Sequence, residues 1–175
     1  MGNNLKRIVV IGPESTGKST LSKQLAEALS TLWVPEYARA YLEQLDRPYD
    51  EHDLLKIAQG QLTLEDVIAA EANRFLICDT DLYVIKVWSE SKYNRCHPWV
   101  LEQVATRKYD MYLLTDIDKQ WEDDPLREHS GPAERQYFYN IYKDIVTASG
   151  LPFAFIHGNP HERLQLALQA IQAQF

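Results

Sequence analysis

The sequence predicts an α/β fold, in which a five-stranded parallel sheet is covered by helices on both faces. Five short apolar runs alternate along the chain with longer segments whose apolar residues recur at the helical period. No two neighbouring runs are joined by the tight turn that a β-hairpin requires, so each strand is expected to return through a helix. Strict alternation of this kind is typical of a parallel sheet with helices on either side.

The first strand gives the clearest signal. Residues Arg7 to Ile11 form an uninterrupted run dominated by β-branched side chains, which is typical of a central strand buried on both faces. Further strands are predicted at residues 32–34, 75–78, 109–114 and 153–156. Ligands of such sheets bind beyond the carboxyl ends of the strands, so the residues that follow each strand are the first candidates for a site.

Helices are predicted at residues 18–29, 36–45, 53–72, 82–88, 99–106 and 134–149, and a last one follows Asn159. This last helix has the strongest start signal. Asn159 is a good N-cap, Pro160 suits the first helical position, and Glu162 completes a capping box. For the helix at 53–72, either Asp50 or Asp53 is a suitable cap.

The segment 116–132 differs from the rest of the chain, because it is polar and shows almost no periodicity. It predicts a long loop, and long loops in compact domains often serve as lids over an active site. With 175 residues and no linker-like stretch, the whole chain, 1–175, is expected to form a single domain.

Composition excludes several classes of function. The formal net charge is -7 and there is no basic run, so neither nucleic acid nor an anionic membrane surface is an expected partner. No apolar stretch approaches the length of a membrane-spanning helix. The two cysteines, Cys78 and Cys96, are too few for a disulfide framework, which favours a reduced, cytoplasmic protein.

The turn after the first strand carries the strongest functional motif. Residues 12–19 match G-x-x-x-x-G-K-[ST] in full, the Walker A motif of the P-loop NTPase fold. Gly12 and Gly17 can take positive φ, so that successive N–H groups form a nest for phosphate oxygens beside a helix N-terminus. Lys18 is expected to contact the β- and γ-phosphates, and Ser19 to offer its hydroxyl to Mg²⁺. The residues predicted to bind ATP are Gly12, Glu14, Ser15, Thr16, Gly17, Lys18, Ser19 and Thr20.

Two carboxylates follow the strand at 75–78. Asp79 stands where P-loop proteins place the carboxylate that holds Mg²⁺, directly or through water, so Ser19 and Asp79 are the predicted metal ligands. The alternative for such a residue is to cap the next helix, and Asp81 suits that task better because Leu82 would be the first helical residue. Asp81 is kept as a candidate substrate-binding residue beside Asp79.

The edge of the sheet after the second strand is expected to face the phosphate acceptor. Glu36 and Arg39 lie one helical turn apart, where a carboxylate can accept a hydroxyl proton and an arginine can hold an anion. The alternative is a solvated ion pair of little energetic weight. Tyr37 and Trp88 can stack on a flat ring, above all a cationic one, although most large aromatic residues belong to the core.

The predicted lid contains Arg127. An arginine that closes over the γ-phosphate stabilises the transferred charge and excludes water, whereas the alternative is a surface arginine among acidic neighbours. The candidate catalytic residues are thus Lys18, Asp79, Arg127 and Glu36. A nucleotide-dependent switch is the competing class of protein, but the GTPase patterns N-K-x-D and D-x-x-G do not occur, which favours ATP.

Four stretches of the chain resemble the ribosylnicotinamide kinase domain of NadR-type NAD-biosynthesis proteins. These stretches are residues 12–19, 34–39, 78–81 and 121–127. A vast superfamily shares the phosphate loop, whereas the Pro-Glu-Tyr-Ala-Arg and Trp-Glu-Asp-Asp-Pro-Leu-Arg stretches are much more specific. The resemblance extends over essentially the whole chain.

The resemblance implies a P-loop kinase that passes the γ-phosphoryl group of ATP to the 5′-hydroxyl of nicotinamide riboside, giving nicotinamide mononucleotide. Glu36, Arg39 and Asp81 are then expected near the ribose, and Tyr37 or Trp88 beside the ring. The general base is left open among Asp79, Asp81 and Glu36. A kinase for another small nucleoside or nucleotide is the nearest alternative.

Members of this family often carry an adenylyltransferase domain before the kinase, and some also a DNA-binding helix-turn-helix. Because the phosphate loop begins at residue 12, we expect neither of those activities here. The sequence therefore predicts a stand-alone kinase.

Overall fold

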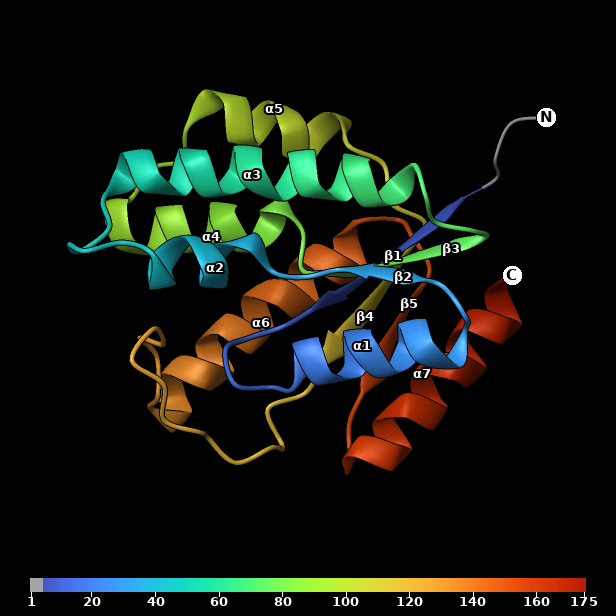
Figure 1. The fold of residues 1–175 in the computed structure, drawn as a ribbon. Helices are drawn as coiled ribbons and strands as arrows, with labels where there is room; N and C mark the ends of the chain where they lie inside the picture. Colours follow the sequence, from blue (N-terminus) through green and yellow to red (C-terminus); the bar gives the residue numbers. More distant parts are fainter. Residues whose placement is uncertain (1–4) are drawn as a thin grey trace.

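The computed structural model describes residues 5–175, so the first four residues of the predicted domain lie outside the described part. Strands and helices alternate in the predicted order (Figure 1). The strands are β1 (Lys6–Ile11), β2 (Leu32–Val34), β3 (Phe75–Asp79), β4 (Met111–Thr115) and β5 (Phe153–Ile156). The helices are α1 (Lys18–Ala28), α2 (Tyr37–Glu43), α3 (Glu51–Ala69), α4 (Leu82–Tyr93), α5 (Pro98–Thr106), α6 (Pro132–Ala148) and α7 (Pro160–Gln174).

The five strands form one parallel sheet in the order β2-β3-β1-β4-β5. β1 is central, and its Val9 pairs with Cys78 of β3 on one side and with Tyr112 of β4 on the other. Since all strands run in one direction, their carboxyl ends meet at one edge of the sheet, where the candidate residues were expected. The predicted α/β fold with a five-stranded parallel sheet is confirmed.

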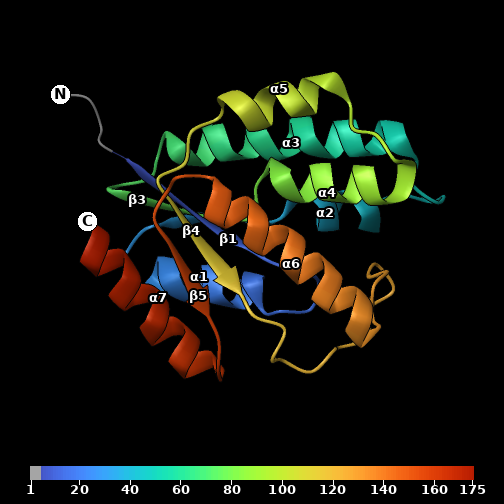
Figure 2. The ribbon, with the colours of Figure 1, turned by 180° about the vertical axis from the view of Figure 1, so that it is seen from behind.

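Helices cover both faces of the sheet, as the two opposite views show (Figures 1 and 2). Because alternate residues of a strand point to opposite faces, Ile8 and Val10 pack with α1 and α7, whereas Val9 and Ile11 pack on the side of α6. A further apolar cluster joins α2, α3, α4 and α5 to one another. This helical cluster forms the wall that faces the phosphate loop across the carboxyl edge.

Several boundaries differ from those predicted. α3 begins at Glu51 because Asp50 caps it, accepting hydrogen bonds from the N–H groups of His52 and Asp53 in a capping box. α4 continues to Tyr93, five residues beyond the predicted end at Trp88, and stops where Asn94 adopts a left-handed conformation. β4 begins at Met111 and not at Tyr109. The Arg7 N–H donates to the Asp110 carboxylate over 2.9 Å, so it is not available to extend the hydrogen-bond ladder between β1 and β4.

The segment between β4 and α6, residues 116–131, is irregular and lies across the carboxyl edge of the sheet (Figures 1 and 2). It corresponds to the predicted long loop, and α6 begins at Pro132, two residues earlier than predicted. Within residues 5–175, no helix combines the length and apolar character that crossing a membrane requires.

Candidate active site

The phosphate loop joins β1 to α1 in the conformation that its glycines allow. Gly12 has φ +150° and packs so closely on β4 that a Cβ there would lie 2.4 Å from Thr115 Oγ1. Gly17, the N-cap of α1, has φ +80°. Both positions exclude an ordinary side chain, which explains the two invariable glycines of the motif in physical terms.

Hydrogen bonds inside the loop fix its shape. The Thr16 hydroxyl donates to the Pro13 carbonyl over 2.8 Å and lies 2.7 Å from the Thr115 hydroxyl. Lys18 Nζ also donates to the Pro13 carbonyl, over 2.7 Å, so the ammonium group folds back over the loop. The loop therefore holds a cation beside the open N-terminus of α1, where anions bind favourably.

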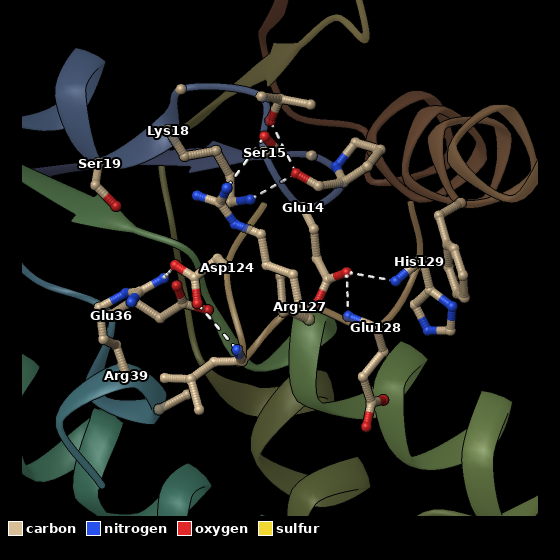
Figure 3. Close-up of a pocket in the computed structure, with 18 of the residues that line it drawn as sticks. Glu14, Ser15, Lys18, Ser19, Glu36, Arg39, Asp124, Arg127, Glu128 and His129 are labelled. Carbon is tan, nitrogen blue, oxygen red and sulfur yellow. Dashed lines mark hydrogen bonds and ion pairs between the residues drawn. The ribbon is translucent and has the colours of Figure 1, made fainter. Parts of the chain in front are cut away.

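A cavity of about 420 Å³ opens above this loop. Every residue from Gly12 to Thr20 lines it, including all eight residues predicted to bind ATP. Its other walls come from α2 and the residue before it, from one side of α4, from the irregular segment and from α6. Figure 3 shows how charged side chains of the phosphate loop, of the start of α2 and of the irregular segment gather around one space.

Ser19 lines the cavity and is hydrogen-bonded to Asp79, which does not line it. The Ser19 hydroxyl donates to Asp79 Oδ2 over 2.5 Å, while Asp79 Oδ1 is buried and has no hydrogen-bond partner among residues 5–175. A hydroxyl and a carboxylate with a free, buried oxygen are hard oxygen ligands, the set that Mg²⁺ prefers. The two predicted metal ligands thus fit a magnesium ion.

The environment of Asp79 disfavours its charge. Burial, followed by repulsion from Glu36, raises the pKa of Asp79 to about 6, although Lys18 and the Ser19 hydroxyl act in the opposite direction. A carboxyl group whose pKa is raised on folding costs stability as the pH rises from its ordinary value of 3.8 through about 6. The ligand-free protein therefore carries an electrostatic cost at neutral pH that a bound cation would offset.

We expect Asp79→Asn to raise the melting temperature of the ligand-free protein at pH 7.5 and to leave it nearly unchanged at pH 4, where both forms are neutral. The same variant is expected to lose the stabilisation that Mg²⁺ with a nucleotide gives the unmodified protein. Thermal unfolding at both pH values, with and without Mg²⁺ and AMP-PNP, measures both effects.

Asp144→Asn, an exposed position on α6, is the matched control and should leave all four melting temperatures unchanged. An Asp79→Asn protein that is less stable at pH 7.5, or that still gains stability from Mg²⁺ with AMP-PNP, would contradict this view of the carboxylate.

The opposite wall of the cavity contains Glu36, Arg39 and Trp88, three of the residues that the sequence suggests for substrate binding. Arg39 Nη2 donates to Asp124 Oδ2 over 2.7 Å, which joins α2 to the irregular segment (Figure 3). This bond, ahead of the attraction from Asp124 and Glu36, raises the pKa of Arg39. Arg39 is therefore a permanent cation at this wall, and Asp124 is a site residue that the sequence did not single out.

The irregular segment also contacts the phosphate loop. Arg127 Nη1 donates to Ser15 Oγ over 3.2 Å and to the Glu122 carbonyl over 2.6 Å. The Glu14 carboxylate in turn accepts the backbone N–H groups of Glu128 and His129, at 3.1 and 3.0 Å (Figure 3). The segment thus covers the phosphate loop in the position expected of a lid, with Arg127 lining the cavity.

A cluster around Tyr49, absent from the sequence-based prediction, fixes Trp88 in the wall. The Trp88 Nε1–H donates to the Tyr49 hydroxyl over 2.8 Å, and the two rings meet edge to face at 4.9 Å. The same hydroxyl donates to Glu128 Oε1 over 2.7 Å and accepts from Lys92, which bonds Glu128 at 3.0 Å. The indole is therefore oriented by groups that also anchor the irregular segment.

Two predicted substrate-binding residues lie away from the cavity. Asp81 is 2% exposed, accepts from the Tyr83 N–H and from the Tyr112 hydroxyl, and thus caps α4. Burial raises the pKa of Asp81 to about 7, although both hydrogen bonds act to lower it. The Tyr37 ring packs on Gly60 of α3, where a Cβ would lie 2.2 Å from the ring. Asp81 and Tyr37, both predicted to bind the substrate, are thus not among the residues that line the cavity.

A parallel sheet, a phosphate loop after its first strand and an aspartate at the end of the neighbouring strand define the class of P-loop nucleotide-binding proteins. The chain belongs to the family described as "AAA domain", which it matches over residues 7–163. Among individual proteins it is similar to the trifunctional NAD biosynthesis/regulator protein NadR of Salmonella typhimurium strain LT2. The two are 26% identical over 158 residues, which is 87% of this chain and 38% of the relative.

Solved structures show the same relationship at the level of the fold. A NadR protein in complex with NR, nicotinamide riboside, superimposes with a TM-score of 0.80 at 21% identity, over 98% of this chain and 50% of the other. A NadR protein in complex with NAD and AMP-PNP gives a TM-score of 0.77 at 21% identity, over 98% and 49% of the two chains. The chain therefore spans half or less of the length of the NadR proteins it matches.

Proposed function

We propose that this chain is an ATP-dependent kinase that phosphorylates the 5′-hydroxyl of nicotinamide riboside, giving nicotinamide mononucleotide. The observation that carries the proposal is that one cavity joins the phosphate loop to Glu36, Arg39 and Trp88. The similarity to NadR supports the choice of substrates, since one NadR structure contains NR and another contains AMP-PNP.

ATP binds with its phosphates on residues 12–20, and the riboside occupies the part of the cavity between α2 and α4. Val84, Val87 and Trp88 give this part an apolar surface with one aromatic ring. Glu36 adds a negative charge, and a pyridinium ring carries a positive one. An aromatic face and a carboxylate together favour such a ring over a neutral base.

Glu36 is the general base in this proposal. Asp79 is bonded to Ser19, and Asp81 is buried against Tyr112, so of the three carboxylates Glu36 is the one that lines the cavity. From that wall it can orient the 5′-hydroxyl and accept its proton as the bond to phosphorus forms. Lys18 and Arg127 hold the negative charge of the transferred group, and Mg²⁺, when bound by Ser19 and Asp79, supplies further positive charge there.

An assay of ADP release with different acceptors tests the proposal. Nicotinamide riboside is compared with adenosine, uridine and deoxynucleosides at equal concentration, each with ATP and Mg²⁺. We expect nicotinamide riboside to give the highest kcat/KM, and mass spectrometry to identify nicotinamide mononucleotide as the product. A higher kcat/KM with another nucleoside would overturn the acceptor. Binding of AMP-PNP without any acceptor-dependent ADP release would overturn the kinase.

Gln61 of α3 determines how Glu36 is presented. It is 3% exposed, its Oε1 accepts the Tyr37 N–H over 2.7 Å, and its Nε2 donates to the Pro35 carbonyl over 3.3 Å. One amide thus holds the backbone on both sides of Glu36.

We expect Gln61→Met, which keeps the length of the side chain but loses both bonds, to lower kcat/KM for the acceptor by roughly tenfold or more while KM for ATP stays unchanged. Steady-state kinetics with each substrate varied in turn measures the two effects. Gln59→Met, at an exposed position of the same helix, is the control and should behave like the unmodified protein. An unchanged acceptor kcat/KM in folded Gln61→Met would contradict this role.

A further inference from the structure

Arg163 is a buried arginine that the proposed reaction does not use directly. It lies in the first turn of α7, is 5% exposed, and does not line the cavity. A guanidinium group is costly to bury unless its N–H donors are satisfied. The partners that satisfy them show what this residue does.

The donors of Arg163 reach the loops that follow three different strands. Nη1 donates to the Thr16 carbonyl of the phosphate loop after β1. Nη2 donates to the Asp116 carbonyl after β4, over 3.1 Å, and Nε to the Gly158 carbonyl after β5, over 2.8 Å. Arg163 therefore connects the three loops at the carboxyl edge of β1, β4 and β5.

Asp118 completes this arrangement. Its carboxylate pairs with Arg163 Nη2 and also accepts the Gly158 N–H over 2.5 Å. Burial acts to raise the pKa of Asp118, but the Gly158 N–H and Arg163 outweigh it, so the pKa is lowered. The buried arginine thus has a charged partner that remains ionised at neutral pH.

The bond to Thr16 has a direct consequence for the phosphate loop. In a trans peptide the C=O of one residue and the N–H of the next point in opposite directions. Arg163 bonds the Thr16 carbonyl, and its Nη1 lies 3.7 Å from where a Gly17 Cβ would be. Because Thr16 lines the cavity and Arg163 does not, we infer that this carbonyl points away from the cavity. The N–H of Gly17 is therefore turned toward the cavity, where a phosphate oxygen would accept from it.

The peptide at the other end of the loop is held by residues of the loop itself and of α1, since Lys18 also donates to the Pro13 carbonyl. The Pro13 carbonyl accepts from the Thr16 hydroxyl over 2.8 Å, which turns the N–H of Glu14 to the opposite side of that peptide. Short-range bonds suffice there, because donor and acceptor are three residues apart. The Thr16–Gly17 peptide depends instead on a side chain 147 residues further along the chain.

We propose that Arg163 is a positioning residue for nucleotide binding, which orients the Gly17 amide through the Thr16 carbonyl and couples the phosphate loop to the loops after β4 and β5. This inference depends on the proposed function only in that the loop binds the phosphates of ATP. N–H groups that already point to the anion site need no rearrangement when the anion binds. Loss of the hydrogen bond from Arg163 to the Thr16 carbonyl should therefore lower the affinity for the nucleotide and not the affinity for the acceptor.

The test uses Arg163→Met in the full chain, with calorimetric titration of AMP-PNP in the presence of Mg²⁺ and with steady-state kinetics. We expect Kd for AMP-PNP and KM for ATP to rise roughly tenfold to a hundredfold, the effect of misplacing a binding group by about 1 Å. KM for nicotinamide riboside stays unchanged. A merely structural arginine would reduce the amount of folded protein and hence kcat, without separating the two KM values.

Three further variants keep the inference falsifiable. Arg163→Lys retains the charge but cannot donate to three carbonyls at once, so it should also weaken AMP-PNP binding. If Arg163→Met does not fold, the Kd of Arg163→Lys tests the proposal. Asp118→Asn leaves the three carbonyl bonds available, so it should lower the melting temperature with Kd nearly unchanged. Arg95→Met, at a side chain that is 73% exposed and paired with Glu51, is the control for the substitution itself.

If folded Arg163→Met or folded Arg163→Lys binds AMP-PNP with the same Kd as the unmodified protein, Arg163 is not a positioning residue. Failure of the unmodified protein to bind AMP-PNP would instead overturn the proposed function, so the two failures are distinguishable.

Discussion

Lys18→Ala is expected to lower the rate of phosphoryl transfer by at least roughly a thousandfold while the protein keeps its fold. The Lys18 ammonium group lines the cavity and, within the described part of the chain, makes one hydrogen bond, to the Pro13 carbonyl. In the proposed reaction its charge acts on the β- and γ-phosphates within a partly enclosed site, with little screening, so the loss is expected to be largest where negative charge is transferred. Turnover of ATP with nicotinamide riboside, and circular dichroism for the fold, measure the two outcomes.

Two variants make this result specific. Lys23→Ala removes an exposed lysine from the same helix and should have no effect on turnover. Lys18→Arg keeps the charge but replaces a compact ammonium group by a planar fork, so it should restore little activity in a loop shaped for a point charge. Turnover of Lys18→Ala at the rate of the unmodified protein would remove the phosphate loop from the mechanism.

The fold could be predicted from the sequence because its signals are local. Ile8 to Ile11 are fully buried, as an unbroken β-branched run predicts for the central strand. The length of α4 could not be predicted, because the residues after Trp88 are mainly polar and the apolar period fades. Ser89 is nevertheless buried, since its hydroxyl bonds the Arg95 carbonyl at 2.7 Å, and this contact lies beyond the helix itself.

The position of Asp81 shows where local patterns fail. Residues two apart in a strand share a face, so Asp79 and Asp81 would point the same way if β3 continued. Thr80 instead adopts φ +73°, which ends the strand and redirects the chain. Asp81 then lies against Tyr112 of β4 and caps α4. A left-handed threonine is uncommon enough that the sequence gives no sign of it.

The residues that hold the site in shape left no motif in the sequence. Gln61 lies among the buried positions of an amphipathic helix, and Arg163 stands next to the apolar face of α7. Their partners are backbone groups 26 and 147 residues away, which the folded chain alone brings together. Motifs identify residues that contact phosphate, because that chemistry restricts residue type. Bonds to backbone carbonyls restrict residue type far less.

Arg127→Met is expected to lower kcat by about a thousandfold while Kd for AMP-PNP changes little. Arg127 lines the cavity from the irregular segment, where its guanidinium reaches Ser15 of the phosphate loop and the Glu122 carbonyl. A cation supplied by a separate segment contributes most when charge develops on the transferred phosphoryl group, and less to the ground state. Single-turnover kinetics with nicotinamide riboside measures the rate of phosphoryl transfer, and titration of AMP-PNP measures Kd.

Arg39→Met provides the contrast that this prediction needs. Arg39 lies on the wall opposite the phosphate loop, bonded to Asp124, so its loss should raise KM for the acceptor and reduce kcat much less. Arg39 and Arg127 both hold the irregular segment in place, Arg39 through its bond to Asp124 and Arg127 as a member of the segment. If both variants changed kcat and KM in the same way, the segment would act only by closing the cavity. A large drop in kcat confined to Arg127→Met requires instead that its charge act on the transferred group. An Arg127→Met protein with unmodified kcat would exclude the segment from catalysis.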